Sequence, residues 1–477
     1  MPKEYGYLIN GKWLKSEKKR EIKNPYNEEV VGLINVPDID KAKESIDYAQ
    51  SAYESFRESP SHIRSGILKK IVEGIYKRKE EFAKILVLEG GKPLKTARVE
   101  VERAMATFSI AAEEANRFSG GELLPIDLIP GTEKRFGISR RFPLGVVMGI
   151  SPFNFPLNLV AHKVAPAIAS GNALILKPAS QTPISALMLG EVTIEAGLPD
   201  GILNVVPLPG GQIEPVIEDD RIKKVSFTGS DEIGWELRRK HTKKKVTLEL
   251  GGNSATIIDE DTPDMDFAAS RNAWGAFYQA GQSCISVQRI YVHEKIFDKF
   301  LADFINETKK LKLGDPMLED TDLGPVIDND SADRIMRWID EALENGAELV
   351  TGGKRDGKLV EPTVLTGVPH NSKVSCQEIF GPVVHVEPYK DFDEALDRVN
   401  DSRYGLQAGV FTRDMKKAFK AYHALQVGGV IVNDYPSFRV ENMPYGGVKD
   451  SGVGKEGLSH AIEAMTELKL MVVNLDY

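Results

Sequence analysis

The chain has 477 residues, of which 42% are hydrophobic and 27% are charged, and its formal net charge is −9. This length favours about two or three domains, and the negative charge argues against a general nucleic-acid binder, which needs a basic surface. Its two cysteines, Cys284 and Cys376, support neither a disulfide framework nor a cysteine-based zinc site, and the histidines show no HExxH pattern, so we expect no metal.

Residues 1–13 are polar and lack the apolar core of a signal peptide, so the cytoplasm is the expected location. Residues 142–161 carry no charge, which raises the question of a membrane span. Pro143, Pro152 and Pro156 interrupt this stretch, and a helix in lipid cannot lose that many backbone donors. We therefore expect a buried strand followed by a loop, and no membrane partner.

The N-terminal part of the chain is predicted to be helical after a short extended start. Helices are expected over residues 40–56, 61–88 and 95–118. Ser61 is the predicted N-cap of the second helix, and Gly90 with Gly91 ends it.

Residues 145–258 alternate between short apolar segments and helical segments. We predict strands at 145–150, 173–176, 202–206, 224–227 and 246–250, and helices at 160–169, 185–196 and 231–240. This alternation predicts βαβ units and a parallel sheet, which binds ligands at the carboxyl ends of its strands.

The second half repeats this pattern from about residue 251. Helices are predicted at 263–279, 295–311 and 392–399, and strands at 287–292 and 383–386. These elements predict a second α/β domain. A charged strand at 131–142 and an edge strand at 471–475 are further expected, both suited to a ribbon partly exposed to water.

Cys284 follows Gly-Gln-Ser at a predicted helix-to-strand junction, where a ligand can reach a thiol. A thiolate is the best protein nucleophile near neutral pH. The alternative interpretation is a small buried hydrophobic residue.

Glu249 stands at the apolar end of a predicted strand, where burial of a carboxylate is costly. It is either a strand-end carboxylate that faces solvent or a general base with a raised pKa. Gly251 and Gly252, which follow it, would let a ligand or another backbone approach closely.

Asn154 lies in the loop of residues 151–156, which has the sequence SPFNFP and follows a buried strand. Its two prolines leave few hydrogen bonds within the loop, so the Asn154 amide would be free to donate to a developing oxyanion. The alternative is an asparagine that satisfies the loop backbone.

Two further segments are typical of nucleotide binding. Lys177 closes a strand in LKPAS (176–180), and Gly229 with Ser230 forms a glycine turn at a helix start, where backbone amides would face a pyrophosphate. No GxGxxG fingerprint is present, and Ser230 is equally consistent with an ordinary N-cap.

Seven motifs follow one another along the chain: SPFNFP (151–156), LKPAS (176–180), FTGS (227–230), LELGG (248–252), GQSC (281–284), EIFGP (378–382) and PYGGVKDSG (444–452). In this order and at these spacings, the sequence resembles the aldehyde dehydrogenase superfamily over nearly its whole length.

The resemblance implies an α/β fold with two Rossmann-like parallel-sheet domains and a small β ribbon for oligomerisation. It places a nicotinamide cofactor-binding domain at residues 1–120 and 144–250 and a catalytic domain at 251–458. Residues 121–143 and 459–477 would be oligomerisation segments, and a homodimer or homotetramer is expected.

The resemblance also implies oxidation of an aldehyde to a carboxylic acid. Cys284 would attack the aldehyde, and Asn154 with the Cys284 backbone N–H would stabilise the oxyanion of the thiohemiacetal. Glu249 would then activate the water that hydrolyses the thioester. Glu467 matches a glutamate of the family's proton-relay and water path.

NADP or NAD is the implied cofactor. Residues that match the family's cofactor-binding positions are Ile150, Ser151, Lys177, Ser180, Gly229, Ser230, Glu378 and Phe380. Strictly NAD-using members often carry Glu at position 180, where it repels a 2′-phosphate. Because Ser180 removes that repulsion and Lys177 is near, we hypothesise use of NADP, or of both cofactors.

The segment FRVENMPYGG (438–447) resembles a branch that acts on small oxygenated aldehydes, including lactaldehyde-type enzymes. Arg103 and Arg439 match positions near the substrate, and the expected substrates are lactaldehyde, glyceraldehyde or succinic semialdehyde. Alternatively, both arginines pair with carboxylates such as Glu102 and Glu441.

Two other functions are compatible with this fold. One is an acylating dehydrogenase that passes the acyl group to coenzyme A, and the other is a non-catalytic binding or structural protein. Members that use coenzyme A often lack the glutamate, so the presence of Glu249 favours a free acid as product. The joint presence of Cys284, Glu249 and Asn154 argues against a non-catalytic protein.

Overall fold

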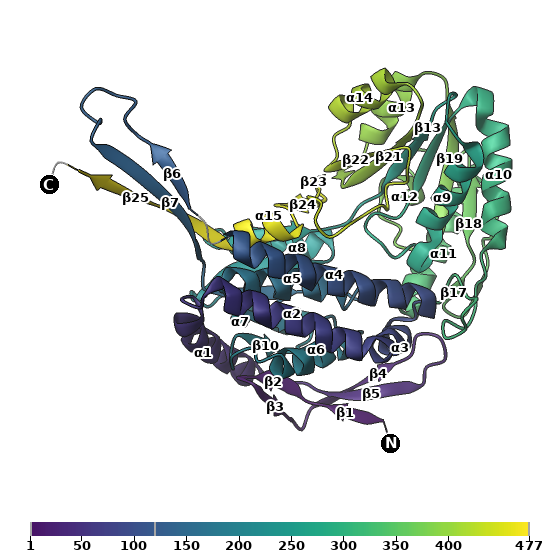
Figure 1. The fold of residues 1–477 in the computed structure, drawn as a ribbon. Coiled ribbons are helices and arrows are strands. Elements are labelled where there is room, and N and C mark those ends of the chain that lie inside the picture. Colours follow the sequence, from purple (N-terminus) through teal and green to yellow (C-terminus); the bar gives the residue numbers. More distant parts are fainter. Residues whose placement is uncertain (1, 119–120, 476–477) are drawn as a thin grey trace.

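The computed structural model describes residues 2–118 and 121–475. Residues 1, 119–120 and 476–477, which include ends of the predicted domains, lie outside the described residues. The chain forms two α/β units, each built on a large sheet, and a long β ribbon that projects away from both (Figure 1).

The first unit holds an eight-stranded sheet in the order β24-β12-β11-β8-β9-β10-β2-β3. These strands are Gly452–Val453, Lys245–Glu249, Ile222–Thr228, Val146–Ile150, Ala173–Lys177, Leu203–Val205, Tyr7–Ile9 and Lys12–Leu14. The five strands from β12 to β10 are parallel, as the βαβ pattern predicts, and antiparallel strands lie at both edges.

Helices enclose this sheet. They are α1 (Ile39–Phe56), α2 (Ser61–Lys77), α3 (Lys79–Gly90), α4 (Leu94–Phe118), α5 (Asn158–Ser170), α6 (Ile184–Glu195), α7 (Glu214–Ile217) and α8 (Asp231–Lys240). Every residue of β8 and β9 is buried, because α1 and α5 pack against both strands. A small sheet of β1 (Lys3–Tyr5), β5 (Val30–Asn35) and β4 (Lys19–Lys23) completes the N-terminal part.

The predicted helix over residues 61–88 is wrong in one respect, because the structure breaks it at Arg78. There the backbone leaves the helical region (φ −111°, ψ 16°), and the Arg78 side chain pairs with Glu81 and Glu191. Ser61 is the first helical residue rather than the cap; Pro60 occupies the cap position, without a side-chain hydrogen bond.

The second unit holds a seven-stranded sheet in the order β15-β18-β19-β14-β13-β21-β22, parallel except for β15. The strands are Glu348–Thr351, Thr363–Thr366, Val383–Tyr389, Arg289–His293, Ala255–Ile258, Gln407–Phe411 and Gly429–Val432. The helices are α9 (Met265–Phe277), α10 (Phe297–Lys310), α11 (Asn329–Glu344), α12 (Lys373–Cys376), α13 (Phe392–Asn400) and α14 (Met415–Ala424). Two-stranded pairs join β16 (Arg355–Asp356) to β17 (Leu359–Val360) and β20 (Tyr404–Gly405) to β23 (Val448–Lys449).

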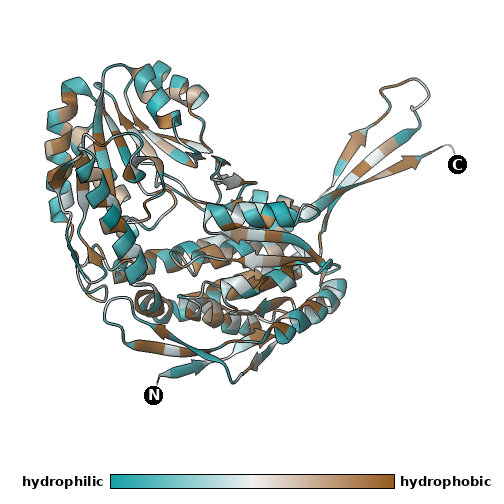
Figure 2. Ribbon diagram, turned by 180° about the vertical axis from the view of Figure 1, so that it is seen from behind, coloured by the Kyte–Doolittle hydropathy of each residue, from teal (hydrophilic) through white to brown (hydrophobic). Residues whose placement is uncertain are grey.

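The ribbon is an antiparallel sheet of β6 (Glu122–Pro125), β7 (Arg135–Pro143) and β25 (Thr466–Asn474), in the order β25-β7-β6. The predicted edge strand is therefore confirmed, although it begins five residues earlier than expected because β25 pairs with β7 over its whole length. The predicted strand at 131–142 starts only at Arg135, since a turn that includes Gly131 (φ 93°) precedes it. Hydrophobic and hydrophilic residues mix along this ribbon (Figure 2), and helix α15 (Leu458–Ala464) leads into β25.

None of the helices formed by residues 2–118 and 121–475 combines the length and the apolar character needed to cross a bilayer.

Candidate active site

A cavity of about 920 Å³ lies at the carboxyl ends of the parallel strands of the first unit. The last residues of β8, β9, β11 and β12, namely Ile150, Lys177, Thr228 and Glu249, all line it. Cys284, Glu378 and Arg439 of the second unit close its other side. The ligand position predicted from the βαβ pattern is thus the position of this cavity.

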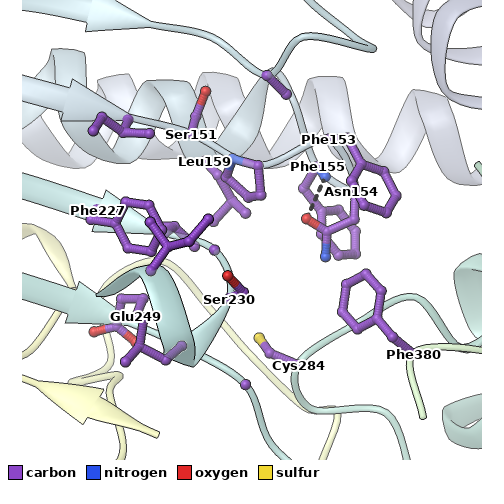
Figure 3. A pocket seen from close by; sticks show the side chains of 18 of the residues that line it. Ser151, Phe153, Asn154, Phe155, Leu159, Phe227, Ser230, Glu249, Cys284 and Phe380 are labelled. Atoms are coloured by element: carbon purple, nitrogen blue, oxygen red, sulfur yellow. Dashed lines mark hydrogen bonds between the residues drawn. The ribbon is translucent and has the colours of Figure 1, made fainter. Parts of the chain in front are cut away.

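Cys284 is presented by a tightly constrained turn after α9. The predicted helix over 263–279 ends at Phe277, and Gln279 and Ala280 adopt left-handed φ values of 58° and 53°. Gly281 follows with φ 68°, and a Cβ there would lie 2.0 Å from the Gly381 carbonyl oxygen. Figure 3 shows the sulfur of Cys284 pointing into the cavity.

Burial raises the pKa of the Cys284 thiol to about 12, and a hydrogen bond with the Tyr445 hydroxyl opposes this effect (Sγ to Oη, 2.9 Å). The thiolate, which is the reactive form, therefore needs nearby stabilisation.

Asn154 lies across the cavity from Cys284 (Figure 3) and is buried. Its side-chain amide donates to the Gln282 carbonyl at 2.9 Å, and its Oδ1 accepts from the Phe155 backbone N–H at 3.2 Å. One of its two N–H groups thus ties the loop to the turn before Cys284, as the alternative of an asparagine that satisfies the backbone expects. Asn154 also lines the cavity, and donation to an oxyanion stays a prediction.

Glu249 is 3% exposed at the end of β12, so it is not a carboxylate that faces solvent. Among the described residues neither of its carboxylate oxygens has a hydrogen-bond partner. Burial, and secondly the Glu456 carboxylate, raise its pKa well above the ordinary value, against the opposing charges of Arg439 and Lys163. This is the environment of a poised general base.

A buried charge network lies beside Glu249, and of its members Glu456, Lys163 and His162 were not predicted from the sequence. Glu456 accepts a hydrogen bond from Arg439 at 3.0 Å and pairs with Lys163 at 3.5 Å. Glu441 pairs with Arg103 and with His162. A sequence signal existed for Lys163, because it is the one lysine or arginine in helix α5, which is mostly apolar.

The two candidate substrate arginines therefore have both properties considered from the sequence. Each lines the cavity, and each forms an ion pair with a buried carboxylate. Glu441 is one of the two partners suggested from the sequence, whereas Glu456 is not. The Nε of Arg439 is buried and has no hydrogen-bond partner among the described residues.

The residues expected to bind the cofactor all line the same cavity: Ile150, Ser151, Lys177, Ser180, Gly229, Ser230, Glu378 and Phe380. Ser230 is the N-cap of α8, and its side chain forms no capping bond, so the hydroxyl is not committed to the helix. The Oγ of Ser151 is buried without a partner among the described residues. A hydroxyl that is free at a helix start, as in Ser230, fits the binding of a phosphate-bearing nucleotide.

Glu378 and Phe380 approach this cavity from the second unit. Glu378 accepts a hydrogen bond from the Gly252 backbone N–H at 2.9 Å, and burial raises its pKa to about 7. A Cβ at Gly251 would lie 2.6 Å from the Glu378 carboxylate, so the paired glycines admit this side chain. Phe380 packs edge-on against Phe153, with ring centroids 5.8 Å apart.

The structure contradicts the prediction that Glu467 belongs to a proton-relay and water path. Glu467 lies on the ribbon strand β25, its side chain is 63% exposed, and it pairs with Lys245 at 2.7 Å. It does not line the cavity. Glu456, eleven residues earlier, is the buried glutamate that does.

Comparison with known proteins decides the family. The model of the "Aldehyde dehydrogenase family" matches residues 13–471. The chain belongs to the aldehyde dehydrogenase family. The resemblance seen in the motifs is thereby confirmed, and the protein is an NAD(P)-dependent dehydrogenase that oxidises an aldehyde to an acid.

Individual relatives cover nearly the whole chain. The 3-sulfolactaldehyde dehydrogenase of Priestia aryabhattai is 46% identical over 99% of this chain and 98% of its own. Aldehyde dehydrogenase 21 of Physcomitrella patens, solved with the reaction product succinate, is 44% identical with a TM-score of 0.97, covering 100% of this chain and 99% of that one. The glyceraldehyde-3-phosphate dehydrogenase GapN of Methanocaldococcus jannaschii, solved with NADP, is 38% identical with a TM-score of 0.92. The match covers 96% of this chain and 100% of that one.

Proposed function

We propose that this aldehyde dehydrogenase oxidises a short hydroxy- or carboxy-aldehyde that carries an anionic group, and releases a free acid. The observation that supports the anionic group is the position of Arg439 on the cavity wall, where its side chain is 7% exposed and its Nε has no hydrogen-bond partner among the described residues. An anionic oxygen is the natural acceptor for such a donor. The names of the relatives agree, since sulfolactaldehyde and succinate both carry an anionic group.

Cys284, Asn154 and Glu249 divide the chemistry in this proposal. The Cys284 thiolate adds to the aldehyde carbon, and the second N–H of the Asn154 amide and the Cys284 backbone N–H donate to the oxyanion that forms. A nicotinamide cofactor held along the wall that includes Ser151, Ser230 and Glu378 would supply the acceptor for the hydride that leaves this carbon. Glu249 takes a proton from the water that attacks the resulting thioester, and the Cys284 thiolate leaves.

A panel of aldehydes tests the substrate proposal. The substrates are sulfolactaldehyde and succinic semialdehyde, compared with neutral lactaldehyde, glyceraldehyde and propanal. We expect Arg439→Lys and Arg103→Ala to raise KM for the anionic aldehydes by about tenfold or more, with a smaller change for the neutral ones, because a charge-assisted bond contributes about 1.5–3 kcal/mol.

Arg271 offers a matched control. It also pairs with a carboxylate, Asp434, and stacks on an aromatic ring, but it does not line the cavity. Arg271→Ala should leave the ratio of anionic to neutral substrates unchanged. Equal losses for both substrate classes in the Arg439 and Arg103 variants would refute the proposal.

For the cofactor we propose use of NADP, or of NADP and NAD together. Ser180 and Lys177 line the same stretch of the cavity, and neither carries a negative charge that would repel a 2′-phosphate. Ser180→Glu should lower kcat/KM for NADP by at least tenfold while sparing NAD. Steady-state kinetics with both cofactors measure this, and a strong NAD preference of the unaltered enzyme would contradict it.

The remaining expectations are also proposals. The sequence suggests domain boundaries at 120, 143, 250 and 458. It also suggests a cytoplasmic location and a homodimer or homotetramer. The oligomer is supported by the ribbon strand β25, which exposes Leu468, Leu470, Met471 and Val472.

A further inference from the structure

Tyr445 lies directly beside the nucleophile. Its hydroxyl oxygen is 2.9 Å from the Cys284 sulfur, and the side chain is 3% exposed. Its ring packs with Ile285 and Leu406 in a small hydrophobic cluster that Cys284 completes. The phenol is therefore held at the sulfur by packing on its other sides.

Arg439 and Glu456 hold Tyr445 in position through contacts with its ring and its backbone. The guanidinium carbon of Arg439 lies 3.7 Å from the centroid of the Tyr445 ring, and Arg439 is itself paired with Glu456. The backbones of Tyr445 and Glu456 exchange hydrogen bonds of 3.0 and 2.6 Å. The tyrosine, the arginine and the glutamate thus form one unit with a defined orientation.

We propose that the Tyr445 hydroxyl is a catalytic hydrogen-bond donor that stabilises the Cys284 thiolate, and that the stacked Arg439 cation strengthens this donor. The inference rests on the proposed role of Cys284 as nucleophile. A cation over the ring face draws electron density from the phenol, which makes its O–H a better donor to an anion.

The need for this donor follows from the surroundings of the sulfur. Burial disfavours the thiolate, and the carboxylates of Glu378 and Glu249 disfavour it further. Arg439 and the Tyr445 hydroxyl are the groups that act in the opposite direction. Without the hydroxyl, the Arg439 cation opposes the effects of burial and of two carboxylates, so the thiol should ionise at a higher pH.

The variant Tyr445→Phe tests this with little disturbance, because it keeps the ring that packs with Ile285 and Leu406. The readout is the rate at which iodoacetamide alkylates Cys284 as a function of pH, without cofactor or substrate. Mass spectrometry of the Cys284 peptide separates this reaction from alkylation of Cys376. We expect alkylation at pH 8 to be about tenfold slower than in the unaltered enzyme, with the pH midpoint moved upward.

Tyr435→Phe is the matched control. Tyr435 also lies under an arginine, with Arg271 at 4.0 Å from its ring centroid, but it does not line the cavity. This variant should alkylate like the unaltered enzyme. An unchanged alkylation profile in Tyr445→Phe, with thermal unfolding also unchanged, would overturn the inference, as would an equal slowing in both variants.

Cys284→Ser separates this inference from the proposed function. If Cys284→Ser retains turnover, the proposed nucleophile is wrong and the inference falls with it. If Cys284→Ser is inactive while Tyr445→Phe keeps its alkylation profile, only the role of Tyr445 is refuted.

Discussion

At the scale of single residues, the proposed chemistry depends on two buried groups whose charged forms are disfavoured by burial. Glu249 is fully enclosed, and its carboxylate has no hydrogen-bond partner among the described residues. Cys284 is also disfavoured as an anion by burial. In the proposed mechanism both groups react as anions, and both are held in surroundings that resist ionisation, so the rate should depend on pH.

The first prediction concerns this pH dependence. A raised pKa means that the Glu249 carboxylate forms only at higher pH, so thioester hydrolysis should rise with pH up to and through that raised pKa. Glu249→Gln should lower steady-state turnover by about 10²–10⁴-fold and remove this rise. It should retain a burst of reduced cofactor that does not exceed one equivalent per active subunit, measured by stopped-flow absorbance.

Product analysis on the same preparations addresses the acylating alternative. If acyl-coenzyme A forms readily and free acid does not, hydrolysis by Glu249 is not the route. If Glu249→Gln turns over as fast as the unaltered enzyme, hydrolysis by Glu249 is likewise not the route.

At the scale of elements, a buried ion pair connects helix α4 to the loop that carries Asn154. Lys92 pairs with Glu100 of α4 and donates to the Asn154 carbonyl at 2.9 Å. Glu100 also accepts from the Leu157 and Asn158 backbone N–H groups at the start of α5. This pair joins two helices and fixes the backbone from which Asn154, the proposed oxyanion donor, projects.

The second prediction follows from this pair. Glu100→Gln leaves the Lys92 ammonium buried without a counter-charge, so the free energy of unfolding should fall by about 3–5 kcal/mol, measured by urea denaturation. kcat should fall as well, because the Asn154 loop loses its anchor.

Glu80→Gln provides the comparison. Glu80 pairs with Arg98 on the surface, where such a pair contributes about 0–1 kcal/mol. A loss of stability as large as that of Glu100→Gln would show that burial of the pair is not the cause.

At the scale of the whole molecule, the ribbon stands apart from both units (Figure 1) and exposes large apolar side chains. Leu470 is 52% exposed on β25, next to Leu468, Met471 and Val472 on the same strand. An apolar edge strand invites pairing with another chain.

The third prediction is that Leu470→Glu weakens or abolishes the oligomer. Sedimentation velocity should show a shift towards the 52.7 kDa monomer. Leu318→Glu, at an equally exposed leucine (55%) outside the ribbon, should not change the assembly. A monomeric unaltered enzyme, or equal effects of both substitutions, would count against the ribbon as the interface.

Much of the architecture could be predicted because it is encoded locally. The alternation of apolar strands and helices between residues 145 and 258 predicted the parallel strands, and Asp231–Lys240 matches its predicted helix at both ends. Local patterns did not reveal the break at Arg78, where the side chain pairs with Glu191, a residue distant in sequence.

For the candidate site, sequence motifs at strand ends and turns were enough to predict Cys284, Glu249 and Asn154 as candidate reactive groups, and the structure places all three on one cavity. The charged residues that lie next to them could be found only from the packing of distant elements. Glu456 and Lys163 meet across 293 residues, while Glu467 is directed to the ribbon surface. The physical reason is that backbone pattern is local, whereas the burial and pairing of a charge depend on which distant elements pack around it.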